Sequence, residues 1–66
     1  MTIFTERLKE LRLKKGLTQT ELGEKVGVTK QTIINYEKGI TEPSFENLIK
    51  LADLLEVSLD WLFGRE

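Results

Sequence analysis

Residues 18–39 read TQTELGEKVGVTKQTIINYEKG, and this stretch decides the fold. Thr18 followed by Glu21 has the spacing of a capping box, in which a hydroxyl and a carboxylate bond the first free backbone N–H groups of a helix. Gly27 then marks a turn, and Thr29 has the position of a cap for a second helix. The stretch predicts two short helices joined by a tight turn.

Both helices have apolar residues at a spacing that predicts one buried face each. Leu22 and Val26 form the expected buried pair of the first helix, and Ile33 with Tyr36 those of the second. Gly23 is unusual, because glycine inside a helix costs about 1 kcal/mol relative to alanine. We interpret Gly23 as a point of close contact between the two helices; the alternative is a helix that is poor there or ends early.

The second helix, which Gly39 stops, leaves a row of polar side chains facing away from its core: Lys30, Gln31, Thr32 and Asn35. Each can hydrogen-bond a base edge or a phosphate. On an isolated amphipathic helix such residues would simply be solvated. Within a pair of helices of this kind they predict binding to duplex DNA.

Helix signals recur on both sides of this stretch. A helix is expected from a cap at Thr2 or Thr5 to about Lys15, with Gly16 ending it. Its apolar face has the spacing i, i+4, i+7: Phe4, Leu8 and Leu11.

Two more helices are expected towards the C-terminus. Pro43-Ser44 opens a fourth helix, and Ser58 caps a short fifth helix that ends at Gly64. The fourth has an apolar stripe: Phe45, Leu48, Ala52 and Leu55. Trp61, on the fifth helix, is expected in the core. The prediction is one compact all-α domain of five helices over residues 1–66.

Composition excludes several classes of function. The 66 residues include no cysteine and no histidine, so disulfides, thiolate metal sites and the commonest general base are absent. Scattered carboxylates form no catalytic constellation, so an enzyme is the least favoured reading. No apolar run approaches the roughly 20 residues that span a bilayer, and the N-terminus lacks a signal-peptide stretch. We expect a cytoplasmic protein with no metal, no cofactor, no membrane contact and no evident small-molecule ligand.

The net charge of -1 conceals a polarised chain. Residues 1–39 contain eight cations against five anions, which gives +3, and residues 40–66 contain two cations against six anions, which gives -4. The basic half contains the predicted reading helix, although so modest an asymmetry also arises by chance. Lys14 and Lys15 are expected to supply a diffuse positive field.

Almost the whole chain resembles the Cro and phage-repressor helix-turn-helix family, the Xre-like regulators. The resemblance lies in the segments RLKELRLKKGLTQTELGEKVGV, TKQTIINYEKG and EPSFENLIKLADLLEVSLDWLFG. Arg12, the Glu37-x-Gly39 ending, Pro43-Ser44 and the VSLDWL segment make it specific. Three positions depart from the family pattern: Gly23 replaces the usual alanine, Tyr36 an aliphatic residue, and Ile34 a serine or a charged residue.

The resemblance implies a lambda-repressor-like fold whose third helix lies in the major groove of DNA. Lys30, Gln31 and Asn35 match the base-reading positions, and Thr32 is placed to touch a thymine methyl or a phosphate. The resemblance also implies phosphate contacts by a second set of residues: Gln19, Thr29, Lys38 and Ser44. An ion pair is implied between Arg12 and Glu37, with phosphate contact by Arg12 as the alternative.

Family members bind pseudo-palindromic operators as twofold dimers, which implies a homodimer on double-stranded DNA. The contacts are expected around the last helix: Val57, Leu59, Leu62 and Phe63. Some of these must belong to the core, and Leu59 with Phe63 is the preferred exposed pair.

The function expected is that of a sequence-specific transcriptional regulator, most plainly a repressor. The alternative is an antitoxin, a protein-interaction module that neutralises a toxin and binds DNA secondarily. Antitoxins usually have a further segment that covers the toxin, and the end of the sequence at Glu66 disfavours this reading. A restriction–modification controller, or the DNA-binding part of a longer regulator, remains compatible with the sequence.

Overall fold

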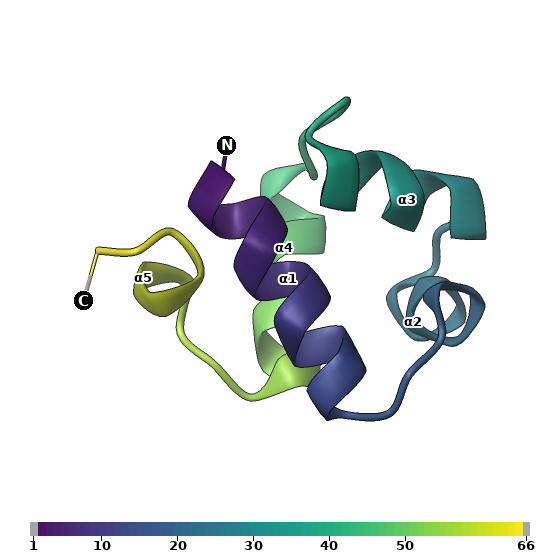
Figure 1. Ribbon diagram of the computed structural model, residues 1–66, viewed down its shortest axis with the longest axis horizontal. Helices are drawn as coiled ribbons and strands as arrows, with labels where there is room; N and C mark the ends of the chain where they lie inside the picture. Colours follow the sequence, from purple (N-terminus) through teal and green to yellow (C-terminus); the bar gives the residue numbers. More distant parts are fainter. Residues whose placement is uncertain (1, 66) are drawn as a thin grey trace.

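The structure, a computed structural model, describes residues 2–65, and this part of the chain folds into five α-helices without strands (Figure 1). They are α1 (Thr2–Lys14), α2 (Gln19–Val26), α3 (Lys30–Lys38), α4 (Phe45–Leu55) and α5 (Leu59–Leu62). The predicted all-α, five-helix class is confirmed. None of the described helices has both the length and the apolar character needed to cross a membrane.

Local capping starts four of these helices. The side-chain oxygens of the cap residues each accept the backbone N–H three positions later, and these residues are Thr18, Thr29, Ser44 and Ser58. At α2 the capping box is complete, because Glu21 Oε1 accepts the Thr18 N–H at 2.8 Å. The expectation of a cap at Thr2 or Thr5 is wrong, since both backbones already lie within α1.

Left-handed backbone conformations end α2, α3 and α4. Gly27 (φ 90°) follows α2 and Gly39 (φ 75°) follows α3, where glycine adopts a conformation that a Cβ disfavours. Glu56 has the same role after α4 with φ 61°, although it is not a glycine. Its carboxylate lies 2.5 Å from Lys15 Nζ, so this strained residue also ties the end of α4 to the end of α1.

The core lies among all five helices, with α1 crossing the front of the molecule in Figure 1 and α4 behind it. Its buried apolar side chains come from all five helices: Phe4, Leu8, Leu11, Leu22, Val26, Ile33, Tyr36, Leu51, Ala52, Leu55 and Leu62. Ile33 and Tyr36 therefore fix α3 by one face. The opposite face is left on the outside of the domain.

Phe45 is not part of the apolar stripe of α4, contrary to expectation. Its side chain is 70% exposed, and the buried face of the helix instead centres on Leu51 and Leu55. At 100° per residue Phe45 lies at the rim of this face, in the first turn of the helix. Leu48 is half-buried and packs against the core, as expected.

Gly23 makes a close contact, but its partner is the turn rather than the body of α3. A Cβ added there would lie 2.7 Å from the carbonyl oxygen of Val28 and 3.1 Å from that of Thr29. The backbone N–H groups of Gly27 and Val28 both donate to the Gly23 carbonyl at 2.8 Å. The missing side chain thus lets the turn fold back tightly on α2.

The short helix α5 is fastened to α1 by aromatic contacts. The rings of Phe63 and Phe4 stack with centroids 5.4 Å apart. The Arg7 guanidinium lies 4.4 Å from the Trp61 ring centroid and donates to the Trp61 carbonyl. Trp61 is half-buried and packs against the core, consistent with the role expected of it.

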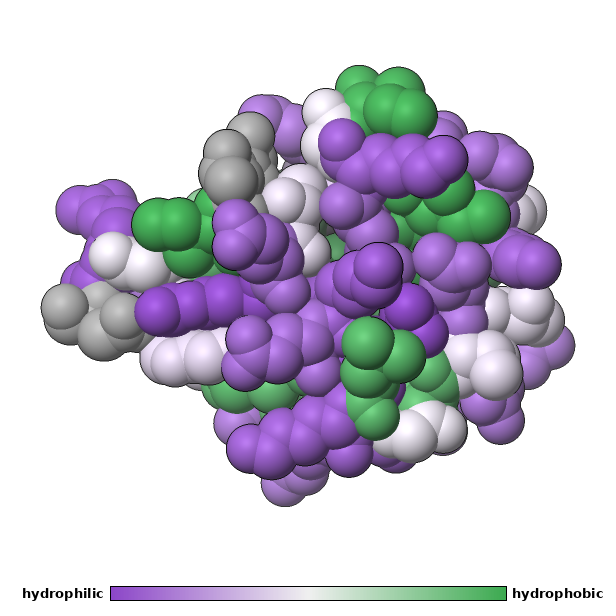
Figure 2. All heavy atoms as spheres, in the orientation of Figure 1, coloured by the Kyte–Doolittle hydropathy of each residue, from purple (hydrophilic) through white to green (hydrophobic). Residues whose placement is uncertain are grey.

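Figure 2 shows that hydrophilic residues cover most of this face of the molecule. The hydrophobic residues visible there form separate small areas, not one continuous patch. Large apolar interfaces need contiguous apolar surface. This face does not provide one.

Candidate nucleic-acid interface

The outer face of α3 presents the four residues expected to read bases. Lys30 and Gln31 are exposed, while Thr32 and Asn35 are half-buried. Gln31 Nε2 donates to Asn35 Oδ1 at 3.0 Å, so these two amides, one turn apart, form a single polar unit. Such a unit still has free donors and acceptors for hydrogen bonds to bases.

Thr29 and Thr32 hold the start of this helix. The Thr29 hydroxyl accepts the Thr32 N–H at 3.1 Å, and the two hydroxyl oxygens lie 2.9 Å apart. Both hydroxyls are therefore partnered within the protein. The hydrogen bonds fix the first turn of α3, which contains Lys30 and Gln31, in one orientation.

Glu37 is the centre of a buried polar cluster that joins three elements. Its carboxylate accepts Arg12 Nε at 2.6 Å and Arg12 Nη2 at 3.3 Å. Gln19 Nε2, at the start of α2, donates to the same carboxylate at 3.1 Å. The cluster links the end of α1, the start of α2 and the last turn of α3.

Arg12 has a mainly structural place in this cluster. Its side chain is 8% exposed, and Nη1 donates to the Leu17 carbonyl at 2.9 Å in addition to the two bonds to Glu37. The implied Arg12–Glu37 ion pair is thus present, with both side chains nearly inaccessible. Gln19 was expected to hold a phosphate; one of its two amide hydrogens serves Glu37 and the other remains for a ligand.

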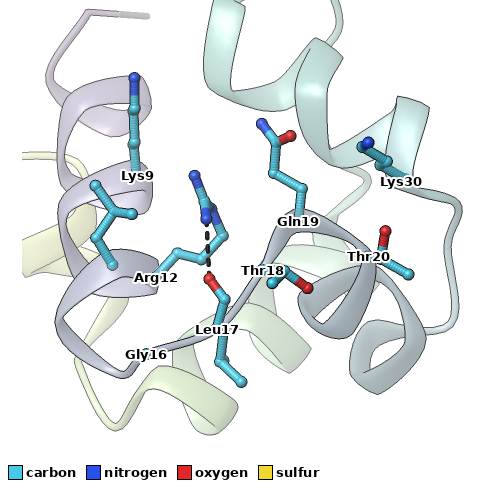
Figure 3. Close-up of a pocket in the computed structure, with 9 residues that line it drawn as sticks. Lys9, Arg12, Gly16, Leu17, Thr18, Gln19, Thr20 and Lys30 are labelled. Carbon is cyan, nitrogen blue, oxygen red and sulfur yellow. Dashed lines mark hydrogen bonds between the residues drawn. The ribbon is translucent and has the colours of Figure 1, made fainter.

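An open cleft of about 700 Å³ lies beside this cluster (Figure 3). It is bounded by the end of α1, the connecting loop and the first residues of α2 and α3: Lys9, Arg12, Leu13, Gly16, Leu17, Thr18, Gln19, Thr20 and Lys30. Its lining contains three cations and no carboxylate. In Figure 3 the amino group of Lys9 and the amide of Gln19 extend in the same direction, on either side of Arg12.

The cleft is suited to an anion. Residues 18–20 at the start of α2 line it, and the positive end of a helix dipole favours negative charge. Lys9 and Lys30 add charge from opposite sides, whereas the charge of Arg12 is largely neutralised by Glu37. We had not singled out Lys9 from the sequence; its spacing of three residues from Arg12 on one helix was the available signal.

The remaining expected phosphate contacts, Lys38 and Ser44, lie at and beyond the C-terminal end of α3. Lys38 is the last residue of that helix and is exposed. Ser44 is exposed and caps α4, its hydroxyl accepting the Asn47 N–H at 3.2 Å. Nearby, Asn47 Nδ2 donates to the Tyr36 hydroxyl at 3.3 Å, which holds the start of α4 against α3.

The residues expected at a dimer contact are less accessible than predicted. Leu62 is fully buried, so it is one of the residues of this set that belong to the core. Leu59 and Phe63 are half-buried and pack against the core; the expectation of an exposed pair is therefore wrong. The cause is tertiary, because Phe63 stacks on Phe4 of α1. Val57 is also half-buried against the core.

Comparison with known proteins agrees with this geometry. A family model described as helix-turn-helix matches residues 8–62. The HTH-type transcriptional regulator ImmR of Bacillus subtilis is 41% identical over 92% of the chain and 48% of its own length. The cryptic phage CTXphi transcriptional repressor RstR of Vibrio cholerae is 40% identical over 91% of the chain and 54% of its own.

Solved structures of related proteins have the same fold. The P22 c2 repressor protein in complex with a synthetic operator superimposes with a TM-score of 0.89, at 36% identity over 96% of both chains. The N-terminal DNA-binding domain of SinR from Bacillus subtilis gives 0.84 at 33% identity, over 96% of this chain and 93% of the other. The chain belongs to the helix-turn-helix family of Xre-like regulators. It spans about half the length of the curated relatives it matches.

Proposed function

We propose that this chain is a sequence-specific DNA-binding unit of a transcriptional regulator, and that the regulator is a repressor. The observation that carries the proposal is the fixed outer face of α3, anchored through Glu37 beside the basic cleft at the start of α2. The relatives named as regulators and repressors, and the P22 c2 repressor bound to an operator, support it.

In this proposal α3 enters the major groove with its N-terminal residues towards the bases. Lys30 donates to guanine O6 and N7, and Gln31 and Asn35 bond adenine N6 and N7. The Gln31–Asn35 hydrogen bond limits the rotamers of both amides before DNA arrives, so less side-chain freedom is lost on binding. Thr32, bonded to Thr29, serves to orient the helix and touches a phosphate or a thymine methyl.

The DNA backbone is held on both flanks of α3. On one side a phosphate lies over the cleft, where Gln19 donates its second amide hydrogen and Lys9 supplies charge. Thr29 contributes at the start of α3, and Lys38 with Ser44 holds the other flank. Such contacts set register and carry no sequence information.

We propose further that two copies bind one pseudo-palindromic operator, with the two α3 helices about 34–36 Å apart. One nine-residue helix reads too few base pairs for specific affinity. The contact would be formed by the accessible parts of Val57 and Leu59, with Phe63 supporting it from beneath. A protein of this kind acts in the cytoplasm. Binding of DNA at this site requires neither a catalytic group nor a cofactor.

Selection of bound duplexes from a random DNA pool tests the proposal. We expect enrichment of a pseudo-palindrome whose half-sites are one helical turn apart. A matched pool selected with the Gln31→Ala variant should lose preference at one base pair of each half-site. A pool that stays random after repeated selection with folded wild-type protein would refute sequence-specific binding.

A further inference from the structure

Ile34 is an apolar residue on the polar side of α3, and the role of its side chain is not explained by the core. The buried positions of the helix are Ile33 and Tyr36. Ile34 is half-buried, yet it is absent from the apolar side chains that pack against the core within residues 2–65. The accessible part of this side chain is apolar surface on the outer side of α3.

The position of Ile34 on the helix surface is defined by its neighbours. Residues three and four apart on a helix lie side by side. For Ile34 these are Lys30 and Gln31 in the preceding turn and Glu37 and Lys38 in the following one. Three of the four belong to the surface that, in the proposed function, contacts DNA. Ile34 thus lies between the base-reading start of α3 and the phosphate contact at its end.

The polar residues of α3 are arranged around this position. Gln31 and Asn35 bond each other along one track of the helix. Lys30, Ile34 and Lys38, at successive four-residue steps, form the adjacent track, with the isoleucine between two cations. In the proposed function Lys30 contacts a base and Lys38 a phosphate, and the isoleucine is the apolar element between them.

In the major groove the thymine C5-methyl is the apolar group that base edges present. We propose that Ile34 is a specificity-determining residue that selects a T·A pair by packing on the thymine methyl. This inference rests on the proposed function and adds a discriminating contact to the polar ones. Burial of one methyl is worth about 0.8 kcal/mol, which corresponds to about fourfold in affinity.

Thymine-to-uracil replacement tests the contact, because it removes the methyl and keeps every hydrogen-bonding group. Each thymine of the selected operator half-site is replaced in turn, and affinity is measured for wild type and for Ile34→Ala. At one position uracil should weaken wild-type binding about fourfold. The same replacement should leave the affinity of the Ile34→Ala variant unchanged.

Ile49→Ala is the matched control. Ile49 is 40% exposed on α4, so the same side chain is removed from a surface outside the reading helix. This control should show the wild-type response to uracil, and circular dichroism should show all three proteins folded. Uracil effects that are equal in wild type and Ile34→Ala at every position, or a selected half-site without thymine, would overturn the inference. Failure to select any operator would instead refute the proposed function.

Discussion

Arg12 and Glu37, 25 residues apart in the chain, form an ion pair with Nε and Oε2 2.6 Å apart and with side chains only 8% and 5% exposed. A second hydrogen bond joins Nη2 to Oε1, and Gln19 donates to the same carboxylate. The pair therefore connects α1 to the last turn of α3 and holds the start of α2 beside both. These hydrogen bonds contribute to fixing the orientation of α3.

Replacement of Glu37 by alanine should destabilise the domain strongly. The change leaves the Arg12 guanidinium buried without its counter-charge, and breaking a buried pair in this way costs about 3–5 kcal/mol. At roughly 4 °C or more per kcal/mol in a domain of this size, the thermal midpoint should fall by about 12 °C or more. Thermal unfolding followed by circular dichroism gives the measurement.

The exposed pair on α4 provides the control. Glu46 and Lys50 are 3.4 Å apart with side chains 78% and 50% exposed, so Glu46→Ala should cost no more than about 0.5 kcal/mol. The double variant Arg12→Met with Glu37→Leu should recover much of the loss, because no buried charge is left unpaired. Equal midpoints for Glu37→Ala and Glu46→Ala would show that the buried pair does not stabilise the fold.

The domain should lose stability in acid partly because the Glu21 carboxylate becomes protonated. Hydrogen bonds from the Thr18 backbone N–H and from the Thr18 side chain lower the pKa of this carboxyl below its ordinary value of about 4.5. A lowered folded-state pKa gives stability that is present above the unfolded value and is lost as pH falls through the folded value. Lys15 lowers the pKa of Glu56 in the same direction.

Glu21→Gln should therefore be less stable than wild type near neutral pH, because the charged cap is lost. Its stability should also decline less between about pH 5 and about pH 2, since one linked carboxyl is removed. Thermal midpoints of both proteins measured across this range give the comparison. Parallel curves for Glu21→Gln and wild type would show that the capping carboxylate does not contribute.

The residues proposed to read bases on α3, Lys30, Gln31 and Asn35, should determine base preference, and the effects of Gln31 and Asn35 should depend on each other. Lys30→Ala and Gln31→Ala should each cost about 1–3 kcal/mol on the selected operator and relax preference at one or two base pairs. Because Gln31 and Asn35 bond each other, Gln31→Ala and Asn35→Ala together should cost less than the sum of the single changes. Binding titrations on operator variants measure this coupling. A variant that keeps the full wild-type base preference would remove its residue from the reading surface.

Cooperative binding tests the proposed dimer. Leu59→Ala trims the apolar group at the start of α5 without placing a charge against the core, and it should reduce cooperativity on a full operator while retaining half-site binding. Ile49→Ala, at an exposed position of α4, should bind the full operator as wild type does. Phe63→Glu is unsuitable, since Phe63 stacks on Phe4 and its loss threatens the fold. One wild-type protein per full operator at saturation would contradict the dimer.

Local chemistry explains why much of this fold could be predicted. A capping box at Thr18 and Glu21, and left-handed glycines at Gly27 and Gly39, act within a few residues, so their pattern is visible in the sequence. The burial of α1, α2 and α3 followed from their periodicity. For that reason the sequence predicts both the two-helix unit and the face of α3 that is left outside.

The errors involve contacts between distant segments. Phe45 has the periodicity of a core residue, but the start of α4 lies at the edge of the packed region and leaves it 70% exposed. The four-residue helix α5 is too short for its buried side to be deduced, and its contacts with α1 determine which side chains remain accessible. The place of Lys9 at the cleft likewise depends on how α1 meets α2.

The most direct test of the central claim is a salt series of binding titrations. Wild type and Lys38→Ala are titrated with the selected duplex and with a scrambled duplex of the same composition, between about 50 and 200 mM salt. We predict about 10³-fold or tighter binding to the selected duplex, a linear fall of log affinity with log salt for both, and similar loss on both for Lys38→Ala. Equal affinity for the two duplexes, or no binding at the lowest salt, would contradict the account.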